Sequence, residues 1–194
     1  NIMKVRESGM PEEGLWQGFF DPRRTLHLLD LDSSVNEAVD LGCGYGTFTI
    51  PAAQLALQIH AFDIEPDMIE TTRRKAQAQG ITNIRYHRRD FVLQGTGLLA
   101  DSVDYVMLFN ILHAENPRNL LRETHRILRP AGKVGIMHWN YDPETPRGPP
   151  MRIRPRPEQC RKWAEQEGFI MIKPFVDLPP YHYGMVGQKG EAIK

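Results

Sequence analysis

The sequence predicts an α/β protein with a doubly wound, mostly parallel seven-stranded sheet and an antiparallel hairpin at its C-terminal end. From Glu37 onward, short apolar segments alternate with helical segments at the spacing of βαβ units. The segment "SVDYVMLFNIL" has the apolar character of a strand that is buried on both faces of a parallel sheet. The last two strand-like segments are joined only by "DLPP", and so short a connection favours an antiparallel pair over another crossover.

The N-terminal half is expected to begin with a helical region. The stretch "LWQGFF" is apolar, and Asp21-Pro22 marks a helix start because proline fits the first helical position. Alternating elements then follow, and they are expected at 37–41 (strand), 47–57 (helix), 58–64 (strand), 65–80 (helix) and 83–91 (strand). Pro51 is compatible with the first of these helices only near its first turn, and Gly80 marks the end of the second.

The C-terminal half continues this alternation and then changes in composition. Asn116 and Pro117 are suited to the start of a helix. The elements expected here are 102–112 (strand), 116–128 (helix), 129–132 (turn), 133–139 (strand), 158–168 (helix), 169–176 (strand) and 181–189 (strand). A basic, proline-rich and irregular segment separates the strand expected at 133–139 from the helix expected at 158–168.

The composition narrows the function classes. Hydrophobic residues make up 41% of the 194 residues and charged residues 25%, as in ordinary globular proteins. Lys+Arg and Asp+Glu are both 24, and this balance disfavours a nucleic-acid partner. The two cysteines, Cys43 and Cys160, form no disulfide framework, and no metal-ligand cluster is visible, so no metal is expected.

The sequence also bears on location. No apolar run approaches the roughly 18 residues that cross a bilayer, and the first residues contain no apolar signal-peptide segment. We therefore expect a cytoplasmic protein with no membrane partner. The sequence does not indicate an oligomeric state.

The segment "EAVDLGCGYGTFTIPAA" carries the most informative motif. Its glycines, Gly42, Gly44 and Gly46, have the spacing G-x-G-x-G, whereas a dinucleotide fingerprint is G-x-G-x-x-G and would need glycine at Thr47. Asp40 lies at the mouth of this turn, where a carboxylate would repel a pyrophosphate and attract an ammonium group. A ligand with a cationic group and no phosphate is therefore favoured over NAD(P).

A second carboxylate refines this ligand. Asp63 ends the second strand, at the position where an acidic residue receives ribose hydroxyls in this topology. S-adenosylmethionine combines an amino-acid head, a sulfonium and an adenosine, and so it satisfies both carboxylates. It is the cofactor that the sequence predicts.

Several motifs resemble those of class I S-adenosylmethionine-dependent methyltransferases. "VDLGCGYG" resembles their motif I, "AFDIEPDMI" the second motif, "RRDF" the third and "SVDYVMLFNILHAENP" the fourth. "ILRPAGKVGIMHW" resembles the helix, turn and strand that follow, and the terminal segments resemble the family's last hairpin. The resemblance covers roughly Glu37 to Trp139 and is nearest to small-molecule methyltransferases of the quinone-biosynthesis group. It implies a Rossmann-like methyltransferase fold.

The resemblance implies roles for residues of the glycine-rich turn. Asp40 would face the methionine ammonium group. The backbone of Gly42, Cys43 and Gly44 would approach the cofactor, and Cys43 is interpreted as a small residue in a tight loop rather than a nucleophile.

It implies further roles at the ends of the next strands. Asp63 would accept the ribose hydroxyls, and Ile64 would pack on the adenine. Asp90 would receive the adenine amino group with Phe91 beside it, although a solvated turn is the other reading of Asp90. Asn110 would lie near the methionine moiety.

Candidate bases follow from the position of the acceptor. Ligands bind beyond the carboxyl ends of strands in open α/β sheets, which selects His113 and His138 after the fourth and fifth strands. A base is needed only if the acceptor must lose a proton, and either histidine has a structural role as its alternative. Trp139 and the Tyr181–His182 pair are candidate pocket walls.

The acceptor is expected to be a small molecule, and the methylated atom type stays open. "FNILHAENP" lacks the Asn-Pro-Pro-aromatic motif of amino-methylating nucleic-acid enzymes, and two cysteines are too few for the arsenite group. Two other functions stay open. One is a non-catalytic S-adenosylmethionine-binding partner or sensor, and the other is an NAD(P)-dependent oxidoreductase, which Asp40 and Thr47 oppose.

The expected organisation is one methyltransferase domain over 1–194. It consists of a helical cap (1–34), a cofactor-binding core (35–140) and a substrate-side loop with the C-terminal hairpin (141–194). The loop segment "PRGPPMRIRPRP" has four arginines and no acidic residue. One hypothesis is a lid that closes with "LWQGFF" and holds an anionic acceptor through Arg152 or Arg154, and the alternative is a solvated loop.

Overall fold

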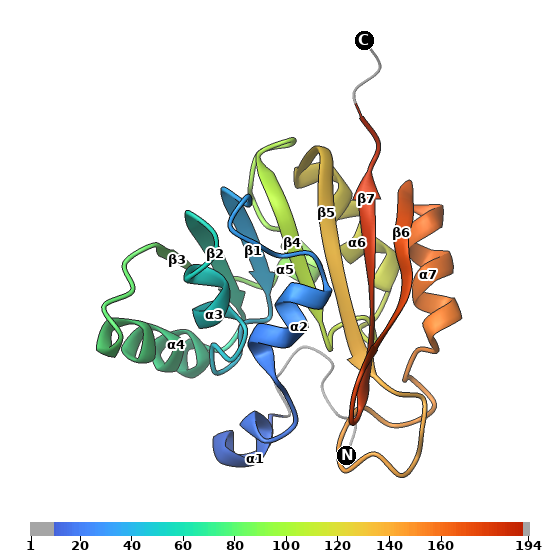
Figure 1. Ribbon diagram of the computed structural model, residues 1–194, viewed down its shortest axis with the longest axis horizontal. Coiled ribbons are helices and arrows are strands. Elements are labelled where there is room, and N and C mark those ends of the chain that lie inside the picture. The colour runs from blue at the N-terminus through green and yellow to red at the C-terminus, as the bar shows by residue number, and fades with distance from the viewer. Residues whose placement is uncertain (1–9, 192–194) are drawn as a thin grey trace.

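A computed structural model describes residues 10–191 and shows one mixed sheet of seven strands in the order β3-β2-β1-β4-β5-β7-β6 (Figure 1). The strands β1 to β5 are parallel, and β7 lies antiparallel between β5 and β6. The strands are β1 (Glu37–Leu41), β2 (Gln58–Asp63), β3 (Ile84–Arg88), β4 (Val103–Phe109), β5 (Leu128–Trp139), β6 (Phe169–Leu178) and β7 (His182–Lys189). This topology confirms the fold class predicted from the sequence.

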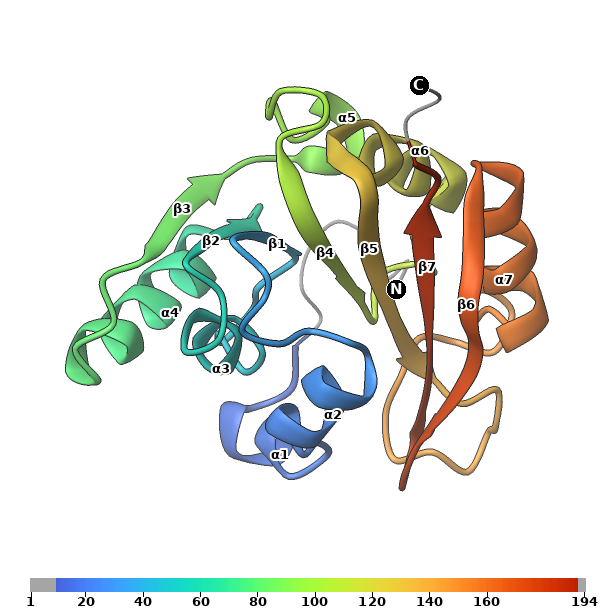
Figure 2. The same cartoon turned by 45° about the horizontal axis from the view of Figure 1, so that its top comes forward.

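Helices cover both faces of the sheet, as the two views in Figures 1 and 2 show. Apolar residues of α2, α3 and α4 join one core cluster, and those of α5, α6 and α7 join the other. The helices of the described residues are α1 (Glu13–Gln17), α2 (Pro22–Leu28), α3 (Thr49–Ala53), α4 (Pro66–Ala78), α5 (Phe91–Gln94), α6 (Pro117–Ile127) and α7 (Pro157–Gln166).

Strand β1 illustrates why the central strands are apolar on both sides. Ala38 belongs to the first core cluster, whereas Val39 and Leu41 belong to the second. Successive side chains of a strand point to opposite faces, so a strand between two helical layers must be apolar throughout. Asp40 is the buried polar residue of β1, and it lies near the end of the strand.

Several elements differ from the expected ones. The helix expected at 47–57 is only Thr49–Ala53, and the strand expected at 83–91 ends at Arg88. Asp90 then begins the short helix α5, since its carboxylate accepts a hydrogen bond from the backbone N–H of Leu93 at 3.1 Å. The expected turn at 129–132 lies within the bounds of β5, at an irregularity in its pairing with β4.

The two expected helix starts, at Asp21-Pro22 and Asn116-Pro117, differ in their capping. The Asp21 side chain accepts a hydrogen bond from Arg24 N and precedes Pro22, the first residue of α2. Asn116 precedes Pro117 at the start of α6, but its backbone is left-handed and its side chain makes no capping bond. Within residues 10–191, no helix is long and apolar enough to cross a membrane, and no group of three or more His, Cys, Asp or Glu side chains could hold a metal ion.

Candidate functional site

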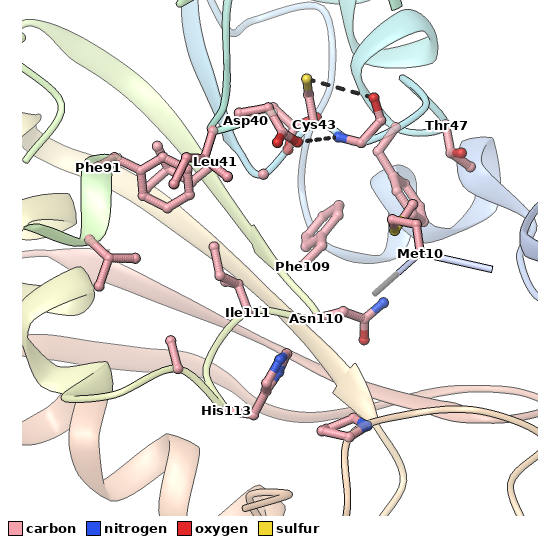
Figure 3. A pocket seen from close by; sticks show the side chains of 18 of the residues that line it. Met10, Asp40, Leu41, Cys43, Thr47, Phe91, Phe109, Asn110, Ile111 and His113 are labelled. Carbon is pink, nitrogen blue, oxygen red and sulfur yellow. Dashed lines mark hydrogen bonds between the residues drawn. The ribbon is translucent and has the colours of Figure 1, made fainter. Parts of the chain in front are cut away.

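A cavity of about 260 Å³ lies beyond the C-terminal ends of the parallel strands (Figure 3). Its walls come from the ends of β1, β2, β4 and β5, from the loops that follow β1, β3, β4 and β5, and from Met10, Pro11 and Trp16. The residues that line it include all of those that the family resemblance implied for the cofactor, which are Asp40, Gly42, Cys43, Gly44, Asp63, Ile64, Asp90, Phe91 and Asn110. His113 also lines this cavity, whereas His138 does not.

The glycine-rich turn has a backbone that favours glycine. Gly42, Gly44 and Gly46 have φ angles of 86°, 52° and 77°, which lie in the left-handed region. A Cβ atom on Gly46 would also lie 2.8 Å from Cγ2 of Thr72. The backbone N–H groups of Gly42 and Cys43 both donate to the carbonyl oxygen of Phe62 at 2.9 Å, so the turn is attached to β2.

Asp40 places a carboxyl group deep in the cavity wall. It is buried, and Thr49 Oγ1 donates to its Oδ2 at 2.6 Å. Burial is the main reason why the pKa of Asp40 rises to about 7, and the charge of Asp63 acts in the same direction. A cation bound here would favour the ionised carboxylate, whereas an anion would be repelled.

Asp63 connects the end of β2 to the glycine-rich turn. Its Oδ2 accepts from the backbone N–H of Gly44 at 2.9 Å, and its Oδ1 accepts from that of Glu65 at 3.0 Å. Burial raises the pKa of the carboxyl group. A carboxylate oxygen can accept more than one hydrogen bond, so both oxygens retain capacity for hydroxyl donors from a ligand.

The segment after β3 forms another wall of the cavity. Phe91 is buried and meets the ring of Phe62 edge-on, with 6.3 Å between the ring centroids.

Cys43 is also buried, and the pKa of its thiol lies well above the ordinary value, mainly because of desolvation. A thiol in this state is a poor nucleophile, which agrees with the interpretation of Cys43 as a small loop residue.

Two polar side chains of the cavity wall are left unsatisfied. Nδ2 and Oδ1 of Asn110 and Oγ1 of Thr47 are buried and have no hydrogen-bond partner within residues 10–191. Asn110 also has a left-handed backbone, with φ 56°. Buried polar groups without partners are rare in native proteins. Their position in this cavity therefore points to a polar ligand.

The two candidate bases occupy different positions. His113 follows β4, and its Nδ1 lies 3.2 Å from Nε2 of His138 on β5. His138 is fully buried behind His113, and burial holds its pKa well below the ordinary value. Burial, aided by the charge of Arg154, lowers the pKa of His113 to about 4. His113 can contact a ligand directly, whereas His138 can act only through another group.

Aromatic side chains form another part of the cavity wall. Phe48 and Phe109 meet edge-on at 4.9 Å, and Trp16 meets Trp139 at 6.4 Å. Sequence reasoning named Trp139 and, as part of "LWQGFF", Trp16. It missed Phe48 and Phe109, although Phe109 directly precedes Asn110 at the end of β4. The expected walls Tyr181 and His182 do not line this cavity but pack against Trp139.

The positions of Arg152 and Arg154 contradict the hypothesis that either of them holds an anionic acceptor. Arg154 is 7% exposed and donates to the backbone carbonyl oxygens of Pro149, Asn140 and Asp142, so its guanidinium group organises the loop. Arg152 is exposed and does not line the cavity.

The other two arginines of the segment differ from one another. Arg156 stacks over the ring of Tyr141, with 3.8 Å from Cζ to the ring centroid. Arg147 lines the cavity together with Gly148 and Pro149. The segment therefore contributes an arginine to the site, but at a position that the sequence did not single out.

Comparison with known proteins gives consistent results. Residues 38–132 match the family model described as "Methyltransferase domain". A curated ubiquinone biosynthesis O-methyltransferase from Xanthomonas oryzae pv. oryzae is 26% identical over 142 residues, which are 66% of this chain and 57% of that protein. The chain thus spans little more than half the length of this relative.

Solved structures share the fold. A SAM-dependent methyltransferase from Aquifex aeolicus superposes with a TM-score of 0.77 at 20% identity, over 88% of this chain and 90% of the other. The 4+2 cyclase SpnF superposes with a TM-score of 0.75 at 14% identity, over 88% and 81% of the two chains. These likenesses concern the fold, which by itself does not determine the chemistry.

Residues 38–132 of this chain carry a methyltransferase domain, and its sheet has the fold of a solved S-adenosylmethionine-dependent methyltransferase. Both findings confirm the family resemblance predicted from the sequence.

Proposed function

We propose that this chain binds S-adenosylmethionine in the cavity and transfers its methyl group to a small organic acceptor. One observation carries the proposal most directly. Two buried carboxylates, Asp40 and Asp63, flank a turn whose glycines have left-handed backbones, and all of them border one cavity. When bound there, S-adenosylmethionine supplies a methyl group that is activated by its sulfonium.

The amino-acid head group would lie at the β1 and β4 ends of the cavity. Asp40 would face the ammonium group, which would hold its carboxyl group in the ionised state. Asn110 and Thr47 would satisfy their buried polar atoms on the same head group. This arrangement gives each unpartnered side chain of the wall a partner.

The adenosine would lie at the β2 and β3 ends. Asp63 would accept the ribose hydroxyls with the capacity that its two backbone donors leave free. Ile64 and Phe91 would pack on the adenine, and Asp90 would receive its amino group. The Asp90 carboxylate already accepts one bond from Leu93 N, so it would carry out both roles.

The acceptor would occupy the aromatic part of the cavity, between Trp16, Phe109 and Trp139. The curated relative named above is an O-methyltransferase, and a hydroxyl acceptor suits the chemistry of this part of the site. A hydroxyl group is a poor nucleophile until its proton is removed. His113, which lines the cavity, would accept that proton while the oxygen attacks in line with the bond from methyl carbon to sulfur.

Isothermal titration calorimetry with S-adenosylhomocysteine and with NAD tests the cofactor. We expect saturable binding of S-adenosylhomocysteine and no binding of NAD, and the reverse result would contradict the proposal. Incubation with methyl-labelled S-adenosylmethionine and a metabolite extract then tests catalysis. Label transfer would identify the acceptor, whereas tight cofactor binding without transfer to any metabolite would identify a non-catalytic binding protein.

A further inference from the structure

The two neighbouring histidines suggest a division of labour at the acceptor side of the cavity. We propose that His138 is a positioning residue that fixes the tautomer of His113, so that His113 presents a proton-free Nε2 to the acceptor. This inference deepens the proposed function and rests on it for its catalytic consequence. The tautomer itself can be tested without any catalysis.

The neighbours of His138 favour a hydrogen on its Nδ1. Its Nδ1 lies 3.4 Å from the carbonyl oxygen of Trp139. A carbonyl oxygen can only accept, so the favourable arrangement has the hydrogen on Nδ1. The opposite tautomer would direct the Nδ1 lone pair at the carbonyl oxygen within a fully buried site.

The surroundings of His138 also favour its neutral form. The groups that face it are His113 after β4, His182 on β7 and Arg154 from the loop after β5, and each of them lowers its pKa. Burial acts in the same direction. His138 is therefore neutral and carries one hydrogen, and with that hydrogen on Nδ1 its Nε2 is an acceptor.

The tautomer of His138 in turn fixes that of His113. Because His138 Nε2 accepts, Nδ1 of His113 must carry the hydrogen that joins the two rings at 3.2 Å. The rings are nearly perpendicular, at 77°, so the Nδ1–H bond can point at the lone pair of the neighbouring ring. The remaining nitrogen, Nε2 of His113, is left with a free lone pair in a residue that lines the cavity (Figure 3).

With its Nε2 free, His113 can take the proton of the acceptor hydroxyl. As the acceptor oxygen forms its bond to the methyl carbon, the hydroxyl proton moves to Nε2 of His113, and the carbon–sulfur bond breaks with its electron pair remaining on sulfur. The His113 imidazolium then donates a charge-assisted hydrogen bond from Nδ1 to His138. In the opposite tautomer, Nε2 would carry a hydrogen and could not accept the proton.

The tautomer is measured by nitrogen-15 NMR of histidine-labelled protein without added ligand, with the His113 signals assigned from a His113→Gln variant. We expect a protonated Nδ1 and an unprotonated Nε2 at neutral pH. A protonated Nε2 on His113 would overturn the inference. Because no ligand is present, this result stands or falls independently of the proposed function.

The catalytic consequence is measured as the initial rate of label transfer from S-adenosylmethionine to the metabolite extract. His138→Phe removes the acceptor, and we expect the rate to fall about 10-fold or more while S-adenosylhomocysteine affinity is unchanged. His138→Gln places an amide oxygen where Nε2 lies, and we expect it to restore most of the rate. Equal rates in the two variants, with the same His113 tautomer, would contradict the inference.

His87→Phe provides a matched control. His87 also pairs with a buried histidine, since its Nε2 lies 3.0 Å from Nδ1 of His60, but neither residue lines the cavity. Its rate of transfer is expected to equal that of the original protein. If His138→Phe fails to fold, the NMR measurement on the unaltered protein and the rate of His138→Gln still decide the question.

Discussion

Oδ2 of Asp63 accepts a hydrogen bond from the backbone N–H of Gly44 at 2.9 Å. The last residue of β2 thereby holds the turn that follows β1, and both residues border the cavity. The carboxylate has two functions in this arrangement. It fixes the shape of the turn, and in the proposed function it also receives the ribose hydroxyls.

The first prediction separates these two functions with Asp63→Ala. Loss of charged hydrogen bonds, each of about 1.5–3 kcal/mol, should weaken S-adenosylhomocysteine binding tenfold or more by calorimetry. The Gly44 bond implies that the free energy of unfolding also falls. Asp104→Ala is the control, because the Asp104 carboxylate likewise accepts from two backbone N–H groups, those of Asn36 and Glu37. Weakened binding in the control, or unchanged binding in Asp63→Ala, would contradict the ribose role.

The second prediction concerns the left-handed backbone of Gly44. Alanine at φ 52° costs about 1–2 kcal/mol of stability, and its Cβ would lie 2.9 Å from Cε of Met10, which lines the cavity. Gly80→Ala meets the same backbone penalty at φ 68°, with no atom within 4 Å of the new Cβ. Both variants should lose similar stability in urea titrations, but only Gly44→Ala should lose cofactor affinity. Equal affinities would mean that the cofactor does not approach this glycine.

Much of the fold could be predicted because its signals are local. Alternating apolar strands and helices, with prolines and glycines at their ends, indicated a parallel sheet before any contact was known. The short helix α5 was not predicted, because the strand pattern continues into "RRDF". The hydrogen bond that the Asp90 carboxylate accepts from Leu93 N shows that the chain turns there. A side-chain bond of this kind is not visible in a hydrophobicity pattern.

The site could be predicted only where its residues belong to sequence motifs. Asp40 and Asp63 follow from their places at strand ends. Phe48 was missed because a phenylalanine in an apolar stretch looks like a core residue. The role of Arg154 was misread for a related reason, since nothing in "PRGPPMRIRPRP" distinguishes an arginine that is buried among carbonyl oxygens from one that faces a ligand.

The third prediction follows from that correction. Arg154→Ala leaves several buried carbonyl oxygens without a donor, so the free energy of unfolding should fall by about 2–4 kcal/mol. Arg147 is exposed and lines the cavity, and Arg147→Ala should change stability by no more than about 0.5 kcal/mol. If the acceptor is anionic, Arg147→Ala should raise its KM and leave cofactor affinity unchanged. Urea titration and steady-state kinetics measure these effects, and a stable Arg154→Ala variant would contradict the structural role.

The fourth prediction concerns pH. The pKa of Asp40 rises from 3.8 in the unfolded chain to about 7, so this residue contributes stability that is fully present below pH 3.8 and is lost as pH rises through about 7. Asp40→Asn removes this dependence. The variant's stability relative to the original protein should therefore increase by about 1.4 kcal/mol per pH unit between pH 4.5 and 6.5. Parallel stability curves from urea titrations at several pH values would show that Asp40 is ionised in the ligand-free protein.

The buried histidines provide the background for that comparison. His113, His138 and His182 all have lowered pKa values, mainly because of burial, and those of His113 and His182 fall to about 4 and about 3. Each contributes stability that is present above pH 6.5 and is lost as pH falls toward its folded pKa, opposite in sign to Asp40. These contributions are common to both proteins and cancel in the difference between Asp40→Asn and the original chain.

The last prediction concerns Asn110, whose two side-chain polar atoms are buried without partners among residues 10–191 and whose φ is 56°. Glycine accepts this backbone freely and removes the unsatisfied groups, whose burial costs about 1–3 kcal/mol. Glycine also makes the unfolded chain more flexible, which takes back about 0.4–1 kcal/mol. Asn110→Gly should therefore raise the stability of the ligand-free protein slightly and weaken S-adenosylhomocysteine binding about tenfold.

A gain in stability together with a loss of affinity in Asn110→Gly would identify Asn110 as a residue that contacts the cofactor. Asn116→Gly is the matched control, since Asn116 also has a left-handed backbone, with φ 54°, but is exposed and does not line the cavity. We expect this control to leave binding unchanged in calorimetry. If Asn110→Gly instead destabilises the protein in urea titrations and binds S-adenosylhomocysteine as tightly as before, the polar atoms of Asn110 do not contact the cofactor.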